Sequence, residues 1–160
     1  MNAFLWNIFL AGAWTFALGE LSLTNLLLGF ALGYAILWLG REVFGATRYC
    51  DRVPRLIELL LFFTGEVVLA NLRVALDVLT PEHRMRAGII AVPLDAKTDG
   101  EITLLANMIT LTPGTLSLGV SADRRHLYVH VMYIRDAEDL DAERRILKEG
   151  FERRLLGVLR

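Results

Sequence analysis

The sequence predicts a membrane protein with three parts: an N-terminal transmembrane helical hairpin, an amphipathic third helix, and a small C-terminal cytoplasmic α/β domain of order β-α-β-β-α. Residues 1–40 contain no Lys or Arg and a single acid, Glu20. The next part, residues 41–80, ends in a run whose charges fall on one stripe of a helix. Residues 81–160 have the ordinary composition and alternating patterns of a soluble domain.

Two apolar runs, residues 2–18 and 21–39, form the predicted hairpin. Each has roughly the length that an α-helix needs to cross ~30 Å of hydrocarbon at ~1.5 Å per residue. The polar break between them supplies a turn. A cleaved signal peptide is disfavoured because no basic residue precedes the first run and a second run follows at once. Gly29 and Gly33 have the spacing that lets two helices approach closely, although chance placement explains the pair equally well.

The third segment, residues 54–79, is predicted to be amphipathic. Five charges fall within a stripe about 100° wide on a helical wheel: Arg55, Glu58, Glu66, Arg73 and Asp77. Arg73 and Asp77 stand four residues apart and can pair. Such a helix either lies in the membrane interface with its stripe towards water, or crosses with its stripe against partner subunits.

Basic residues flank this segment on both sides, which bears on its topology. They are Arg41, Arg48, Arg52 and Arg55 between the second apolar run and the start of this segment's apolar part, and Arg84 and Arg86 after it. Because basic loops remain in the cytoplasm, both flanks are expected inside. The simplest topology therefore has the N-terminus inside, two crossings, and the third segment along the inner surface. Three crossings is the main alternative.

Glu58 and Glu66 are candidates for proton or cation handling, because acids within a membrane segment are often functional. The stripe offers a plainer explanation, which is a solvated or subunit-facing surface. We favour this plainer explanation, and direct ion handling by Glu58 or Glu66 stays an alternative.

The C-terminal part has the pattern of alternating short elements. Thr98 and Glu101 match a capping box that begins a helix, and Pro113-Gly114 ends that helix after Leu111. The expected elements are a strand over 87–94, this helix, a hairpin of strands 115–121 and 126–134 around a polar turn, and a final helix over 138–159.

No catalytic, cofactor-binding or metal-binding residues are predicted. The sequence contains no phosphate-binding loop, dinucleotide glycine motif or hydrolase motif, and its single cysteine, Cys50, excludes disulfides within the chain. His126 and His130 share a strand face but lie ~13 Å apart along it, too far to share a metal by themselves. The acids at 136, 138, 139 and 141 are explained by a helix start. Arg124-Arg125 is typical of a solvated turn that can also touch lipid headgroups. We expect no enzyme activity, no cofactor and no nucleic-acid partner.

One stretch contains more polar residues than are needed to end a helix. Residues 106–115 read Ala-Asn-Met-Ile-Thr-Leu-Thr-Pro-Gly-Thr, and their polar groups can cap the helix end or bind a partner backbone. This stretch, followed by the hairpin strand ending Leu127-Tyr128-Val129-His130, resembles the E subunit of the multisubunit Na+/H+ antiporters of bacteria (Mrp or Mnh type), and the resemblance covers the whole chain.

The resemblance implies an accessory or assembly subunit of a large complex in the cytoplasmic membrane, in contact with other subunits and lipid. In that family the large antiporter-like subunits are taken to carry the ions, the tail of the E subunit faces the cytoplasm, and no catalytic residues are carried over. The alternative is a membrane-anchored α/β domain that binds a ligand or regulates, with His130 and the acid cluster as its sites.

Overall fold

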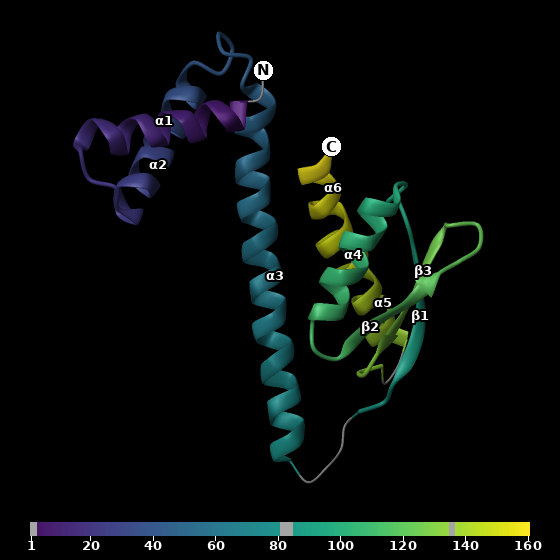
Figure 1. The fold of residues 1–160 in the computed structure, drawn as a ribbon. Helices are drawn as coiled ribbons and strands as arrows, with labels where there is room; N and C mark the ends of the chain where they lie inside the picture. The colour runs from purple at the N-terminus through teal and green to yellow at the C-terminus, as the bar shows by residue number, and fades with distance from the viewer. Residues whose placement is uncertain (1–2, 81–84, 135–136) are drawn as a thin grey trace. The chain divides into compact units, whose positions relative to one another are not determined.

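The chain divides into two compact units, Met1–Pro54 and Arg55–Arg160, in a computed structural model that describes residues 3–80, 85–134 and 137–160 (Figure 1). The elements are α1 (Ala3–Leu18), α2 (Leu23–Leu39), α3 (Thr47–Leu79), β1 (Gly88–Pro93), α4 (Asp99–Leu111), β2 (Thr115–Val120), β3 (His126–Val131), α5 (Ala137–Arg145), η1 (Ile146–Glu152) and α6 (Arg153–Leu159). Helix α3 begins in the first unit and continues through the second.

In the first unit, α1 and α2 pack closely through small residues. The buried side of α1 repeats every four residues, at Ala3, Asn7, Ala11 and Thr15. A Cβ atom added to Gly33 would lie 2.3 Å from the side-chain oxygen of Asn7, and one added to Gly29 would lie 2.9 Å from the Ala11 carbonyl oxygen. The glycine spacing therefore marks a packing face rather than a chance pattern.

The start of α3 differs from the prediction. The helix begins at Thr47, not at Pro54, so Arg48 and Arg52 lie in the helix rather than in a loop. Proline lacks an N–H, so Pro54 leaves the Cys50 carbonyl without its helical donor. The hydroxyl of Tyr34 in α2 donates to that carbonyl oxygen at 3.1 Å. This contact supplies a donor to the carbonyl that the proline leaves without one.

Among the described residues, α3 is the one helix both long and apolar enough to cross a membrane by length and composition. Helices α1 and α2 are apolar but shorter, at 16 and 17 residues.

The second unit contains a three-stranded antiparallel sheet in the order β1-β3-β2. Strand β3 is central, with Ile90 opposite Val129 on one side and Ser117 opposite Val129 on the other. The β2–β3 register shifts between Ser117 and Gly119. The expected β-α-β-β-α order is observed, with β3 ending earlier than predicted, at Val131.

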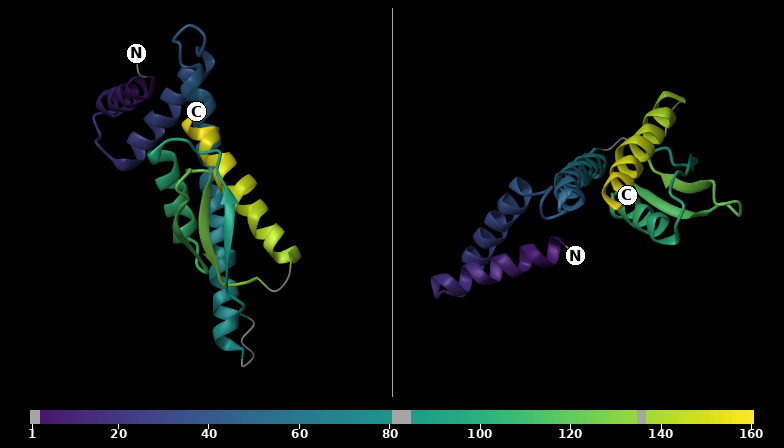
Figure 2. Two further views of the ribbon diagram at one scale, coloured as in Figure 1. Left: turned by 90° about the vertical axis from the view of Figure 1, so that its right-hand side faces the viewer. Right: turned by 90° about the horizontal axis from the view of Figure 1, so that it is seen from above.

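Helices cover one face of this sheet, as Figures 1 and 2 show. The core combines inward-facing strand residues with one face of α4 and of the C-terminal helical run: Ile90, Val92, Leu105, Ile109, Leu127, Val129, Val131, Leu147, Phe151 and Leu155. Helix α3 adds a further layer on the C-terminal run, where Leu59 is buried and the ring centroids of Phe62 and Phe151 lie 5.2 Å apart.

The final helix is not regular, although the sequence predicted a regular one. Between α5 and α6 it widens into the π-helical segment η1. A Cβ atom on Gly150, in this segment, would lie 2.6 Å from the ring of Phe62. The absent side chain of Gly150 is what allows α3 to approach the run so closely.

Candidate functional site

The charged stripe of α3 faces the C-terminal helical run of the same chain. Arg55 donates from Nη1 to the carbonyl oxygen of Gly157 at 3.0 Å. Glu58 accepts from Arg154 Nε at 3.0 Å. Arg73 pairs with Glu143 at 3.9 Å. Sequence patterns offered only water or other subunits as partners for this stripe, whereas the structure places a helix of the same chain beside it and leaves Arg55, Glu58 and Arg73 partly open to solvent.

Arg154 joins three features of this interface. Its guanidinium lies 4.4 Å from the centroid of the Phe62 ring. Its Nη1 donates to the carbonyl oxygens of Glu149 and Gly150 at 3.1 and 3.2 Å. Those carbonyls lie in the π-helical segment, where i→i−4 bonding is interrupted. Arg154 therefore adds side-chain donors to two carbonyl groups of this segment.

The two candidate ion-handling acids differ in their surroundings. The Glu58 side chain is 63 % exposed and forms an ion pair with Arg154. Glu66 lines a small cavity of about 30 Å³ together with Glu143 and the Pro113-Gly114 turn. Burial raises the pKa of Glu143, and the nearby Glu66 carboxylate adds to the increase while Arg73 opposes it.

Asp77 lies against Tyr133 rather than pairing with Arg73. The prediction of an Arg73–Asp77 pair is wrong, because Arg73 pairs with Glu143 on α5 instead. Burial, with the Asp77 carboxylate as a second cause, raises the pKa of Tyr133 to about 12. The C-terminal end of the stripe is thus also covered by the tail.

The polar residues of the 106–115 stretch cap the end of α4. Thr112 Oγ1 donates to the Met108 carbonyl at 3.1 Å, and Thr115 Oγ1 donates to the Ile109 carbonyl at 2.6 Å. Gly114 has φ +90°, which a side chain would disfavour. Thr110 accepts from the backbone N–H of Ser117 at 3.2 Å. Capping therefore accounts for the threonines, whereas Asn107 is exposed.

The remaining candidates form no cluster. His126 and His130 lie on β3, and no group of three or more metal-ligating side chains occurs among the described residues. Glu138 and Asp139 lie in the first turn of α5, where a helix start favours acids. His83, Arg84 and Asp136 lie outside the described residues.

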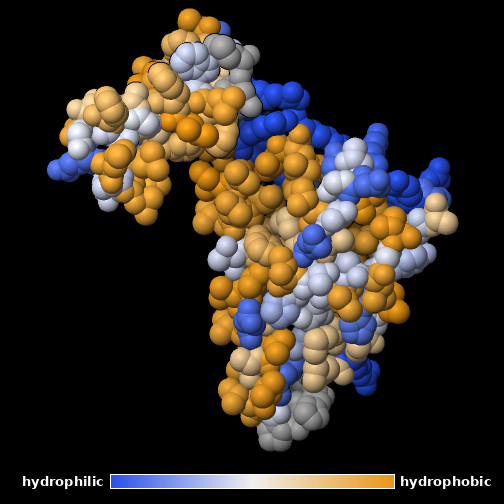
Figure 3. Space-filling model, in the orientation of Figure 1, coloured by the Kyte–Doolittle hydropathy of each residue, from blue (hydrophilic) through white to orange (hydrophobic). Residues whose placement is uncertain are grey.

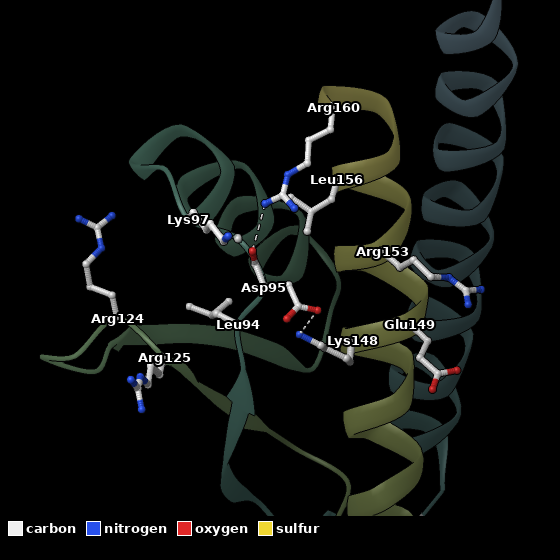
Figure 4. Close-up of a pocket in the computed structure, with 11 residues that line it drawn as sticks. Leu94, Asp95, Lys97, Arg124, Arg125, Lys148, Glu149, Arg153, Leu156 and Arg160 are labelled. Carbon is white, nitrogen blue, oxygen red and sulfur yellow. Dashed lines mark hydrogen bonds and ion pairs between the residues drawn. The ribbon is translucent and has the colours of Figure 1, made fainter.

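A hollow of about 820 Å³ opens beside the C-terminal run (Figure 4). The β1–α4 loop, the β2–β3 turn, η1 and α6 supply its walls: Leu94, Asp95, Ala96, Lys97, Arg124, Arg125, Lys148, Glu149, Arg153, Leu156 and Arg160. Lys148 pairs with Asp95 at 2.8 Å and with Glu152 at 2.7 Å. Burial opposes the charged form of Lys148, but these hydrogen bonds outweigh it and raise its pKa.

Glu152 is the residue of this region that sequence reasoning missed. Its side chain is 1 % exposed, and Oε1 accepts from the backbone N–H groups of Asp95 and Ala96 at 2.6 and 2.8 Å. In the sequence, an acid four residues after Lys148 is typical of an exposed ion pair. Its burial depends on the widened helix and on contact with the β1–α4 loop, which is distant in the sequence, so the local pattern does not predict it.

Comparisons with known proteins identify the family. The model of the family described as Na+/H+ ion antiporter subunit, MNHE, matches residues 7–158. The chain belongs to this family. It is 38 % identical to the Na(+)/H(+) antiporter E subunit of Bacillus subtilis, over 98 % of this chain and 97 % of that protein. It is 35 % identical to the corresponding antiporter protein of Alkalihalophilus pseudofirmus, over 96 % of each chain.

A solved structure also resembles this antiporter subunit over its whole length. The match is to a chain of the membrane-bound sulfane sulfur reductase, an archaeal respiratory membrane complex, with a TM-score of 0.54 and 26 % identity over 97 % of this chain and 98 % of that one. The resemblance inferred from the 106–115 stretch is thereby confirmed. The chain is a subunit of a multisubunit Na+/H+ antiporter in a membrane, and its partners are other subunits of that complex.

Proposed function

We propose that this subunit is an accessory, structural component of the antiporter that braces its cytoplasmic face. In this proposal residues 1–40 cross the cytoplasmic membrane twice, residues 41–80 form a basic loop and an amphipathic helix along the inner surface, and residues 81–160 are a cytoplasmic α/β domain. It carries no ions and performs no catalysis itself.

The single observation that carries this proposal is the length over which the tail packs on α3. Contacts with the C-terminal run begin at Arg55 and extend to Arg73, and Tyr133 lies beside Asp77. At ~1.5 Å per residue, these positions span about 33 Å of helix, close to the thickness of the hydrocarbon layer. If α3 crossed the membrane, it would carry charged surfaces of the tail into lipid, which is costly.

The exposed apolar surface of α3 supports an interfacial position. It exposes large apolar side chains along its length, visible as the orange surface of α3 in Figure 3: Leu56, Ile57, Leu60, Leu61, Val68, Leu69, Leu72, Leu76, Val78 and Leu79. A helix that lies in the membrane interface is expected to turn one face towards lipid or apolar partner surfaces and the other towards a polar domain.

Cysteine labelling tests the topology. In a Cys50→Ala background, Thr80→Cys at the end of α3 is expected to resist a membrane-impermeant maleimide on intact cells and to react once the membranes are opened. Glu20→Cys, in the turn between α1 and α2, is the control that should react from outside. Labelling of Thr80→Cys on intact cells would show that α3 crosses.

Antiport measurements test the accessory role. Glu58→Gln and Glu66→Gln are expected to leave Na+-dependent proton exchange in vesicles unchanged, because each acid faces the tail of its own chain. Deleting the chain should reduce recovery of the assembled complex. Loss of exchange by an acid variant that still assembles would instead assign ion handling to that acid.

A further inference from the structure

Strand β1 lies at one edge of the sheet, with β3 between it and β2 (Figure 1). In an antiparallel pair, only alternate residues direct their N–H and C=O groups at the partner strand. The N–H of Leu94 donates to the carbonyl oxygen of Arg125 at 2.8 Å, so the even-numbered residues of β1, such as Ile90, face β3. Ile89 and Ala91 therefore direct their N–H and C=O groups away from β3, along the outer edge.

The outer edge of β1 is closed at its C-terminal end only. The same alternation places the carbonyl of Pro93 on this edge, where it accepts from Lys148 Nζ at 2.8 Å. Proline has no N–H to offer. The backbone groups of Ile89 and Ala91 form no hydrogen bond along this edge with another described residue. Each of these two residues therefore keeps one N–H and one C=O for an incoming chain.

The opposite edge of the sheet, along β2, is closed by the chain itself. The N–H of Thr115 donates to the Thr112 carbonyl at 3.2 Å, and the N–H of Ser117 donates to Thr110 Oγ1 at 3.2 Å. The register shift after Ser117 interrupts this edge further. Sheets protect their edges by such coverage, by bulges or by charged side chains. Strand β1 has a continuous register and no charged residue, and proline protects only its last position.

The sheet face beside the open edge is apolar. This is the face that the helices leave uncovered, and on it Ile89 and Leu116 flank His130 of the central strand. Ile89, Leu116 and the nearby Tyr128 are 64 %, 46 % and 42 % exposed. The three strands contain no Asp, Glu, Lys or Arg. A strand added beside β1 would bury Ile89 by apolar cross-strand contact, so an uncharged, extended segment fits this edge.

We propose that an extended, apolar segment of another antiporter subunit pairs with β1 as a fourth strand of the sheet. Strand addition uses main-chain hydrogen bonds along an open edge and side-chain contacts beside it, and β1 offers both. The occupant is assigned to another subunit because the partners of this chain are other subunits of the complex. The contact goes beyond the proposed bracing role and does not depend on whether α3 lies in the interface or crosses.

Hydrogen exchange resolved to single amides tests the proposal on the wild-type protein. In the isolated full chain in detergent, the N–H groups of Ile90 and Val92 are expected to exchange slowly, and those of Ile89 and Ala91 rapidly. In the assembled antiporter, Ile89 and Ala91 are expected to exchange at least about tenfold more slowly than in the isolated chain. Ile90 and Val92 are the internal controls, because β3 already protects them.

Two results of this measurement would overturn the proposal. The first is equally fast exchange of Ile89 and Ala91 in the isolated chain and in the complex, which would show that the edge stays open. The second is slow exchange of both in the isolated chain, which would show that a second copy or the chain itself occupies the edge.

A pair of substitutions at position 91 tests the backbone donor directly. Ala91→Pro removes the outward N–H without removing a bond to β3, whereas Ala91→Thr adds a side chain and keeps the N–H. Affinity purification through a tag on this chain is expected to recover less of the other subunits with Ala91→Pro than with Ala91→Thr. Equal recovery with the two variants would contradict the proposal. Slow exchange of Ile90 and Val92 in the isolated proline variant checks that its sheet is formed.

Discussion

Glu152 is a buried side chain that holds the start of the loop between β1 and α4. It is almost fully enclosed and receives two backbone N–H groups and the Lys148 ammonium. A buried carboxylate is tolerated when donors surround it, and removing it leaves those donors unpaired. The backbone at Asp95 and Ala96 is therefore held by Glu152.

Replacing Glu152 therefore should destabilise the second unit. Glu152→Ala is expected to cost about 3 kcal/mol of folding free energy, since two backbone donors and a partly buried ammonium lose a charged acceptor. Chemical unfolding of the detergent-solubilised chain measures the change. Glu149→Ala, an exposed acid three residues earlier, is the matched control and should change stability little.

Glu101 gives the tail a dependence on pH. A hydrogen bond from Arg160, followed by the N–H groups of Lys97 and Thr98, lowers the pKa of Glu101 from 4.5 to about 2. Because the pKa is lowered in the folded state, the ionised Glu101 carboxylate stabilises the fold. This stabilisation is fully present above pH 4.5 and is lost as the pH falls from there towards 2. The unfolding temperature of the wild type should fall more steeply over that window than that of Glu101→Gln, and parallel curves would contradict this.

Among the elements, the C-terminal helical run depends on its π-helical segment to pack against α3. The widening brings Gly150 under the Phe62 ring and leaves carbonyls to which Arg154 donates. A side chain at position 150 has no room unless the ring moves. At this segment, α3 and the C-terminal helical run fit closely against each other.

Gly150→Ala is accordingly expected to destabilise the chain by about 1–3 kcal/mol through overpacking. Combining it with Phe62→Leu should cost less than the sum of the two single changes, because the smaller side chain makes room for the added methyl group. A double-mutant cycle from unfolding midpoints measures this coupling. Strict additivity would show that the two residues do not meet.

At the scale of the whole molecule, the apolar face of α3 is a long surface that the described residues of the second unit leave exposed. Leu61 and Leu69 are 70 % and 52 % exposed. In a protein whose partners are other antiporter subunits, such a face is expected to contact lipid or those subunits.

Charges on this face should therefore weaken the attachment of the chain to its complex. Leu61→Glu/Leu69→Glu is expected to reduce the amount of tagged chain recovered with the complex after gentle solubilisation. Leu104→Glu, at an exposed leucine on α4, adds charge elsewhere and should not. Equal recovery of wild type and both variants would show that the face has no such contact.

Local signals in the sequence predicted most of the elements, and long-range contacts explain what those signals missed. The capping box at Thr98 and Glu101 is formed as expected, and α4 ends at Leu111 before the Pro-Gly turn. The partner of the α3 stripe was missed because Glu143 and Arg154 lie far along the chain, and a helical wheel shows only where charges point. The early start at Thr47 was missed because the Tyr34 contact that satisfies the Cys50 carbonyl involves another helix.

Tyr34 and Pro54 are linked through one carbonyl group, that of Cys50. When position 54 is not proline, the helix supplies its own donor, and the hydroxyl at position 34 is dispensable. When proline is retained, phenylalanine at position 34 leaves the carbonyl unpaired. Substitutions at the two positions are therefore expected to be inherited together, and an alignment of relatives would show it as covariation.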